Sequence, residues 1–160
     1  MDVVNQATRS RMMAGIRGRD TKPERLVRSC LTQRGYRYRL YRKDLPGAPD
    51  VVMPGRRVAI FVHGCFWHQH AGCRHAKLPA SNSEFWKPKL ARNVERDREV
   101  VEQLLGMGWR VLTVWECATR RRSEAAALAD RLAVWLDGLE SRGEIAALDR
   151  EGQGRDQAGP

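Results

Sequence analysis

Two short, almost wholly apolar runs constrain the fold of this chain most strongly. They are Val58–Val62 and Val111–Val114. A transmembrane helix would need about 20 apolar residues, and both runs are only as long as a strand. A strand that lacks alternating polar residues has to be covered on both faces. The runs therefore predict central strands of an α/β fold, with helices on both sides of the sheet.

Other elements can be placed around these runs. Thr21-Lys22-Pro23-Glu24 matches a capping box, which predicts a helix from Thr21 that ends before Gly35. A helix between the third and fourth strands permits a parallel crossover, so we expect a mixed central sheet. The expected elements are a helix over 21–34, strands over 36–41, 50–53 and 57–63, a helix over about 88–105, a strand over 109–115, and an amphipathic helix capped by Ser123.

At 160 residues the chain has the size of one domain. We expect a basic arm over residues 1–20, a folded domain over 21–140 and a disordered polar tail over 141–160. The N-terminal residues contain no apolar segment typical of a secretory signal, which favours a cytoplasmic protein. In that compartment the four cysteines are expected to be thiols or metal ligands rather than disulfides.

The charge of the chain is concentrated near its N-terminus. The net charge is +10, and residues 1–43 alone hold 12 basic and 3 acidic residues. A basic arm on a nearly neutral body suits a polyanion, because Lys and Arg displace the counterions that condense on phosphates. A solubilising surface is the alternative, but the clustering favours a nucleic-acid partner.

A hairpin brings a carboxylate close to a strand end. If the chain folds back over Pro54–Arg57, Asp50 lies opposite residue 60 or 61, with Val62 and His63 one diagonal step away. A carboxylate with few other protein ligands is how Mg²⁺ is usually held when it acts on a phosphate. From the hairpin alone, a carboxylate that only caps the turn after Pro49 is an equally good interpretation.

The segment over residues 63–75 contains two cysteines and every histidine of the chain. Cys65, His70 and Cys73 have a spacing suited to three ligands of a tetrahedral zinc. The fourth ligand could be Cys117 or His75, and we favour Cys117 because it follows a buried strand. A redox pair or buried thiols are the alternative.

Two histidines and three aromatic residues near this segment have no role in the zinc site. His63 and His68 lie beside the carboxylate and suggest proton transfer near neutral pH, although either could be a hydrogen-bonded structural imidazole. Phe66, Trp67 and Trp86 could wedge between bases and bend a duplex. Alternatively, these aromatic side chains only cover the zinc site.

Several motifs, in order over residues 5–140, resemble the very-short-patch repair (Vsr) endonucleases. The most specific are the HGCFWH block and the WEC sequence downstream of it. The full set is Ala7–Ser10, Arg19–Thr21, Leu45–Asp50, His63–His68, Glu84–Trp86, Asn93–Asp97, Gly108–Val111 and Val114–Cys117.

This resemblance implies a DNA mismatch endonuclease with a restriction-endonuclease-like core over residues 21–140. Such enzymes nick the strand 5′ to the thymine of a T:G mismatch that arises when 5-methylcytosine deaminates, and so start very-short-patch repair. The implied partners are mismatched double-stranded DNA and, functionally, a cytosine-5 DNA methyltransferase and the repair machinery. We expect a monomer associated with the nucleoid, with catalytic Mg²⁺ and structural Zn²⁺.

The resemblance also assigns roles to individual residues. It implies Mg²⁺ ligation by Asp50 and the backbone carbonyl of Val62, although threonine is usual at the second position. His68 would be the general base, with His63 and Glu24 in support; Glu24 could also complete the capping box. The implied zinc ligands are Cys65, His70, Cys73 and Cys117, and the implied DNA contacts are the intercalating Phe66, Trp67 and Trp86 together with Arg9, Arg11 and Arg17 of the arm.

Two departures from the family pattern affect the zinc loop. Gln69 replaces a histidine, and the loop is one residue longer through Ala71-Gly72, which leaves His70 and His75 as competitors for one ligand position. Two other functions also remain open at this point. One is a restriction-type endonuclease without a mismatch requirement, and the other is a zinc-stapled DNA-binding module without catalysis.

Overall fold

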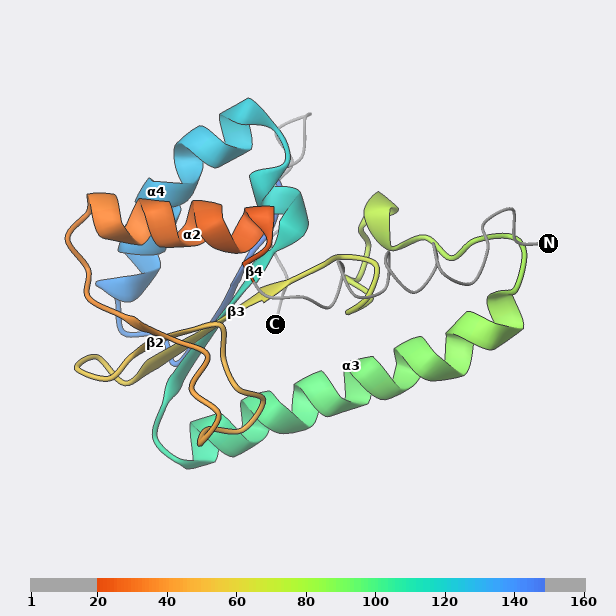
Figure 1. The fold of residues 1–160 in the computed structure, drawn as a ribbon, viewed down its shortest axis with the longest axis horizontal. Helices are drawn as coiled ribbons and strands as arrows, with labels where there is room; N and C mark the ends of the chain where they lie inside the picture. Colours follow the sequence, from red (N-terminus) through yellow and green to blue (C-terminus); the bar gives the residue numbers. More distant parts are fainter. Residues whose placement is uncertain (1–19, 149–160) are drawn as a thin grey trace.

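The computed structural model describes residues 20–148, which form a mixed α/β fold with a five-stranded sheet and three α-helices (Figure 1). The predictions for Arg9, Arg11 and Arg17 lie outside these residues. The elements are α2 (Lys22–Gln33), β1 (Arg39–Leu40), β2 (Val51–Met53), β3 (Val58–His63), the 3-10 helix η1 (Arg74–Ala76), α3 (Ser83–Gly106), β4 (Arg110–Trp115), the 3-10 helix η2 (Glu116–Thr119), α4 (Arg122–Leu136) and β5 (Arg142–Ile145).

The sheet has the strand order β1-β2-β3-β4-β5. The first three strands are antiparallel, and β3, β4 and β5 run parallel to one another. Val51 pairs with Ile60, so the hairpin has the register expected from the sequence. The parallel pairing of β3 with β4 confirms a crossover through α3 and a mixed sheet.

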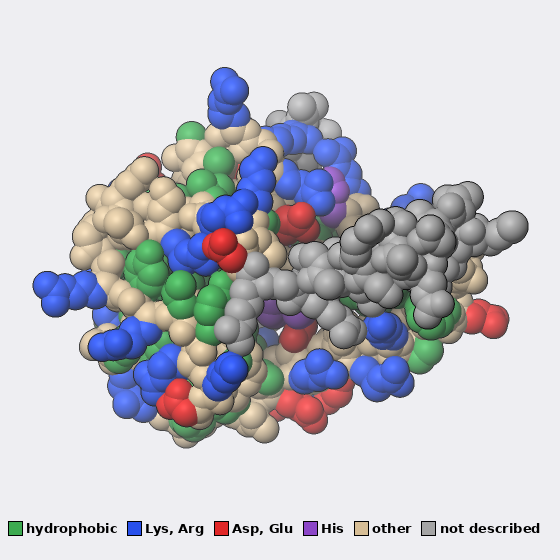
Figure 2. Space-filling model, viewed as in Figure 1, with side chains coloured by type: hydrophobic (Ala, Val, Ile, Leu, Met, Phe, Trp, Pro, Cys, Tyr) green, Lys and Arg blue, Asp and Glu red, His purple; other side chains and the backbone are tan. Residues whose placement is uncertain are grey.

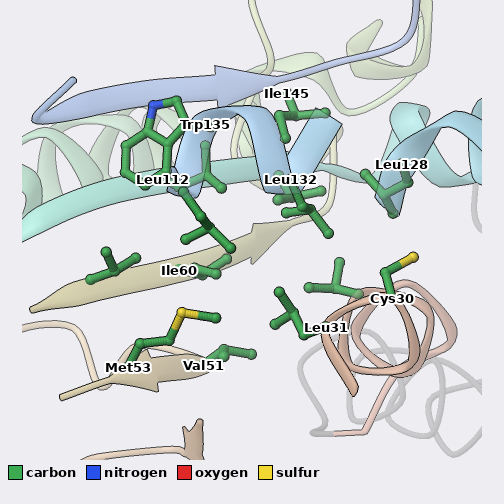
Figure 3. Packing of buried hydrophobic residues seen from close by; sticks show 14 of the residues in the cluster. Cys30, Leu31, Val51, Met53, Ile60, Leu112, Leu128, Leu132, Trp135 and Ile145 are labelled. Carbon is green, nitrogen blue, oxygen red and sulfur yellow. The ribbon is translucent and has the colours of Figure 1, made fainter. Parts of the chain in front are cut away.

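Helices cover both faces of the sheet. In Figure 1, α2 and α4 lie on one face and α3 lies on the other. Val58 and Ile60 of β3 join the core under α2 and α4, whereas Ala59 and Phe61 join the core with α3. Figure 3 shows the first of these cores, in which Leu31 of α2 packs beside the sheet. Both faces of β3 are therefore buried, as its composition indicated.

Two elements differ in length from the sequence prediction. The strand expected over 36–41 is reduced to β1, because β2 is only three residues long; Tyr36 and Tyr38 instead pack against the core of α2 and α4. Helix α3 begins at Ser83 rather than near Pro88, so this proline lies inside the helix. Its missing N–H removes only one bond, to the carbonyl of Glu84 in the first turn.

The segment expected to be a tail begins with a strand. Residues Arg142–Ile145 form β5 at the sheet edge, with Ile145 buried in the core. Gly143 permits this packing, because a Cβ there would lie 2.2 Å from the indole nitrogen of Trp135. The short, mostly polar strand gave no alternating pattern in the sequence. The rest of the expected tail, over 149–160, lies outside the described residues.

No helix within residues 20–148 is both long enough and apolar enough to cross a membrane.

Candidate functional site

A cavity of about 1020 Å³ opens where the residue before β2 and the end of β3 meet the start of α2 and the middle of α3. In Figure 2, histidine and acidic side chains are visible near the centre of the view, with Lys and Arg side chains above and below them. The cavity lining includes every active-site residue expected from the sequence: Glu24, Asp50, Val62, His63 and His68.

Asp50 lies just before β2 and faces the end of β3. The Val62 N–H donates a hydrogen bond of 2.8 Å to Asp50 Oδ2. Burial and, to a smaller extent, the nearby Glu24 carboxylate raise the pKa of the Asp50 carboxyl to about 7, although the hydrogen bond from the Val62 N–H opposes this shift. A buried carboxylate that resists ionisation in this way is a good ligand for a cation, because the cation would stabilise its charge.

Glu24 both caps α2 and lines the cavity. Its Oε1 accepts a hydrogen bond from the Asp20 N–H at 3.1 Å, and its own N–H donates to Thr21 Oγ1 at 3.3 Å. The Tyr41 hydroxyl donates to Glu24 Oε1 at 2.7 Å. The helix cap therefore lies beside the cavity, so Glu24 can both cap α2 and take part in a site there. Tyr41 was not among the expected site residues, because its position at the end of a strand pattern carried no such signal.

His68 forms a dyad with Asp97, a residue of the Asn93–Asp97 motif to which the sequence assigned no role. His68 Nδ1 lies 2.6 Å from Asp97 Oδ2, so the Nδ1–H donates to this carboxylate and Nε2 is left as a base. The His63 ring stacks on His68, with centroids 3.7 Å apart and planes 2° from parallel. Burial, followed by the proximity of His68, holds the pKa of His63 well below its usual range.

His63, His68 and Asp97 also bring three donor atoms within 4.8 Å of one another. A metal ion needs lone pairs that converge on one point, and imidazole lone pairs lie in the ring plane. Because the two rings are stacked and parallel, their lone pairs cannot converge on one ion. The arrangement suits proton transfer better than metal binding.

A second cluster of three thiols and one imidazole could hold a metal ion. The donor atoms of Cys65, His70, Cys73 and Cys117 all lie within 4.8 Å of one another. His70 Nδ1 is 3.7 Å from Cys65 Sγ and 3.6 Å from Cys117 Sγ. Ligand bonds of about 2.0 and 2.3 Å in a tetrahedron give an N to S separation of about 3.6 Å, so this spacing fits zinc. The structure does not bring His75 into the cluster.

Contacts around Cys117 favour its ionised form. Its Sγ accepts hydrogen bonds from the Cys65 thiol, from His70 and from the Ala147 N–H at 3.3 Å, and these contacts lower the pKa of Cys117. A thiolate is the form that binds a metal. The contact with Ala147 also joins the segment after β5 to the cluster.

The three expected wedge residues lie together. The rings of Phe66, Trp67 and Trp86 contact one another edge to face, with centroids 5.3–5.4 Å apart. Asn93 Nδ2 donates to the Trp67 carbonyl at 3.0 Å, which attaches this loop to α3. Phe85 packs on Trp86 and is 62% exposed, so the aromatic group reaches the surface.

Comparisons with known proteins agree on one family. The family model described as DNA mismatch endonuclease Vsr matches residues 1–74. DNA mismatch endonuclease Vsr of Escherichia coli is 46% identical over 153 residues, which cover 94% of this chain and 96% of the relative. Type II nicking enzyme V.XorIIP of Xanthomonas oryzae is 47% identical, over 85% of this chain and 97% of the relative. Type II nicking enzyme V.NaeI of Lentzea aerocolonigenes is 43% identical, over 86% and 84%.

Proposed function

This chain belongs to the Vsr family of DNA mismatch endonucleases, and from this premise we propose that it nicks DNA 5′ to the thymine of T:G mismatches in a Mg²⁺-dependent reaction. The substrate would arise by deamination of 5-methylcytosine, which links the enzyme functionally to a cytosine-5 DNA methyltransferase and to very-short-patch repair. The names of two relatives describe nicking enzymes, which supports cleavage of one strand.

The observation that carries the proposal is the convergence of Asp50 and the His68–Asp97 dyad on one cavity. A metal-dependent phosphodiester hydrolase needs a metal ligand and a base that accepts a proton from water. A DNA-binding module would need neither. Asp50 lies at the open end of the β2–β3 hairpin, and His63 lies at the end of β3, which pairs parallel with β4. This placement in a mixed sheet supports a restriction-endonuclease-like core.

Asp50 and the Val62 carbonyl are the groups that would hold Mg²⁺. Because the N–H and C=O of one strand residue project toward the same neighbour, the Val62 carbonyl lies on the side on which its N–H meets Asp50. Bound there, Mg²⁺ would neutralise charge on the scissile phosphate and acidify water. His68 would take the proton at Nε2, while Asp97 fixes the tautomer and stabilises the charged ring. His63 stays neutral and so does not repel that charge.

Zn²⁺ is the metal that we assign to Cys65, His70, Cys73 and Cys117. Four protein ligands leave no open position, which is typical of a structural site. The loop between Cys65 and Cys73 also carries His68 and Trp67. A metal in this cluster would therefore position both the base and the aromatic group.

The cleavage assay that tests the function compares three duplexes of one sequence, with a T:G mismatch, a T:A pair or a C:G pair at the same position. We expect one nick, 5′ to the mismatched thymine, with Mg²⁺ and none with EDTA. Equal cleavage of the matched duplexes would instead indicate a restriction-type endonuclease. No cleavage of any duplex over a panel of flanking sequences would indicate a binding module.

Replacing Trp67 with Ala should weaken binding to T:G duplex much more than binding to matched duplex. Unstacking a base step costs a few kcal/mol. A wobble pair is less stable than a matched pair, so inserting Phe66, Trp67 and Trp86 beside a T:G mismatch should cost less than inserting them beside a matched pair. Fluorescence anisotropy at one salt concentration, with Ca²⁺ in place of Mg²⁺, measures both affinities. Equal losses would mean that Trp67 only covers the metal loop.

A further inference from the structure

Helix α3 is longer than the sheet that it covers. Its 24 residues span about 36 Å, whereas the six residues of β3 or β4 span about 20 Å. Of its side chains only Leu90 and Leu104 are fully buried. In Figure 1 the first turns of α3 extend past the ends of the strands. The residues of α3 that join the core against the sheet all lie in its C-terminal half: Val100, Val101, Leu104 and Leu105. The N-terminal half therefore contributes little to that core, and another function should account for its length.

One side of this projecting half forms a wall of the active-site cavity. Arg92, Arg96 and Asp97 line the cavity together with Asn93, at the three- and four-residue spacing that places side chains on one helix face. Asp97 holds His68, and Asn93 holds the Trp67 loop. Arg92 and Arg96 therefore lie on the same face of α3 as Asn93 and Asp97, whose hydrogen bonds hold the Trp67 loop and His68.

The carboxylates of the cavity have other partners. Glu24 accepts a hydrogen bond from Tyr41, and Asp50 accepts one from the Val62 N–H. Asp97 pairs with His68, and Glu116 lies 3.2 Å from the Arg120 guanidinium. Within residues 20–148, neither Arg92 nor Arg96 forms a hydrogen bond or an ion pair, and both are exposed. Two guanidinium groups thus face the cavity without an acidic partner there.

We propose that Arg92 and Arg96 bind phosphate groups of the nicked strand next to the scissile phosphate. The inference rests on the proposed function, because it takes DNA as the occupant of the cavity. A guanidinium offers paired donors that match two phosphate oxygens. The two residues are about 6 Å apart along the helix axis, which is more than the axial rise of about 3.4 Å that separates successive nucleotides of one strand. Each arginine can therefore reach a different phosphate.

Arg98 provides a matched control on the same helix. It does not line the cavity, and it is paired with Glu95 at 2.6 Å on the outer surface. The double variant Arg92→Gln/Arg96→Gln removes two cavity-facing charges, and Arg98→Gln removes one from the outer face. Melting curves of all variants should match that of the parent, because none of these side chains is buried.

Affinity for a matched duplex and for a T:G duplex should be measured from 50 to 300 mM salt, with Ca²⁺ in place of Mg²⁺. Each of Arg92→Gln and Arg96→Gln should weaken binding to both duplexes by roughly tenfold. The slope of log K against log salt should become shallower by about 0.9 for each lost contact. Arg98→Gln should change neither quantity appreciably.

A double variant that binds both duplexes with the parent's affinity and salt slope would overturn the inference. A loss confined to the T:G duplex would also overturn it, since phosphate contacts do not read the base pair. Failure of the proposed function would appear differently. In that case the parent would not nick the T:G duplex with Mg²⁺, while the duplex-binding measurements could still be made.

Discussion

Replacing Asp50 with Asn should abolish nicking and, at the same time, raise the melting temperature of the metal-free protein at pH 8. Nicking is lost because the amide replaces the carboxylate that would hold Mg²⁺. Stability rises because the buried Asp50 carboxyl, whose pKa is raised to about 7, has to ionise beside Glu24 in the folded protein at this pH. An amide of the same shape carries no charge there.

The pH dependence of this gain has a definite sign. An unfolded Asp has a pKa of about 3.9, so well below this pH the carboxyl is protonated in both states and costs nothing. As the pH rises from 4 to 7, the unfolded chain releases the proton more easily, and the folded state loses stability. The advantage of Asn over Asp50 should therefore be small at pH 4 and reach about 2–4 kcal/mol above pH 7.

Thermal melts of the parent and Asp50→Asn at pH 4.5 and pH 8, with and without Mg²⁺, measure this effect. Mg²⁺ should raise the melting temperature of the parent at pH 8 and leave that of the variant unchanged, while duplex binding by the variant is largely retained. Strong nicking by Asp50→Asn with Mg²⁺ present would contradict its assignment as a metal ligand. A melting temperature of Asp50→Asn below that of the parent at pH 8 would contradict the prediction that ionisation of Asp50 destabilises the folded protein.

The position of Asp50 opposite the end of β3 could be predicted from the sequence, because strand pairing follows a simple rule. A turn over Pro54–Arg57 fixes which residues of β2 and β3 are opposite, and the observed pairing of Val51 with Ile60 follows from it. The bond from Val62 N–H to Asp50 is a direct consequence of that register. Local geometry was sufficient here because only one short hairpin is involved.

Contacts between distant segments were not accessible in this way. Asp97 meets His68 across 29 residues, and this contact depends on the length and direction of α3 beyond the sheet. The strand β5 was missed because only Ile145 among its four residues is buried, and it forms where Gly143 admits Trp135. Neither the His68–Asp97 contact nor β5 leaves a periodic pattern in the sequence, so both could be identified only from the tertiary structure.

The cluster of Cys65, His70, Cys73 and Cys117, which could hold a metal ion, joins three segments. Cys117→Ser is therefore the second substitution with a large expected effect. Cys65 and Cys73 bound the loop that carries His68, and Cys117 follows β4 directly. Its Sγ also accepts the Ala147 N–H, so the chain after β5 is held at the same point. Loss of this ligand should release the loop and that segment together.

Metal analysis of the purified protein should find about one zinc per chain, and Cys117→Ser should lose most of it. We expect the variant to be destabilised by about 3 kcal/mol, a fall in melting temperature of roughly 6–12 °C for a chain of this size. His75→Ala is the matched control, because His75 lies two residues after Cys73 and outside the cluster. This variant should keep its zinc and its melting temperature.

The opposite result, with full zinc in Cys117→Ser and loss in His75→Ala, would mean that His75 is the fourth ligand. Because the loop between Cys65 and Cys73 carries the proposed base, the zinc-depleted variant should also lose nicking activity even though Asp50 is intact.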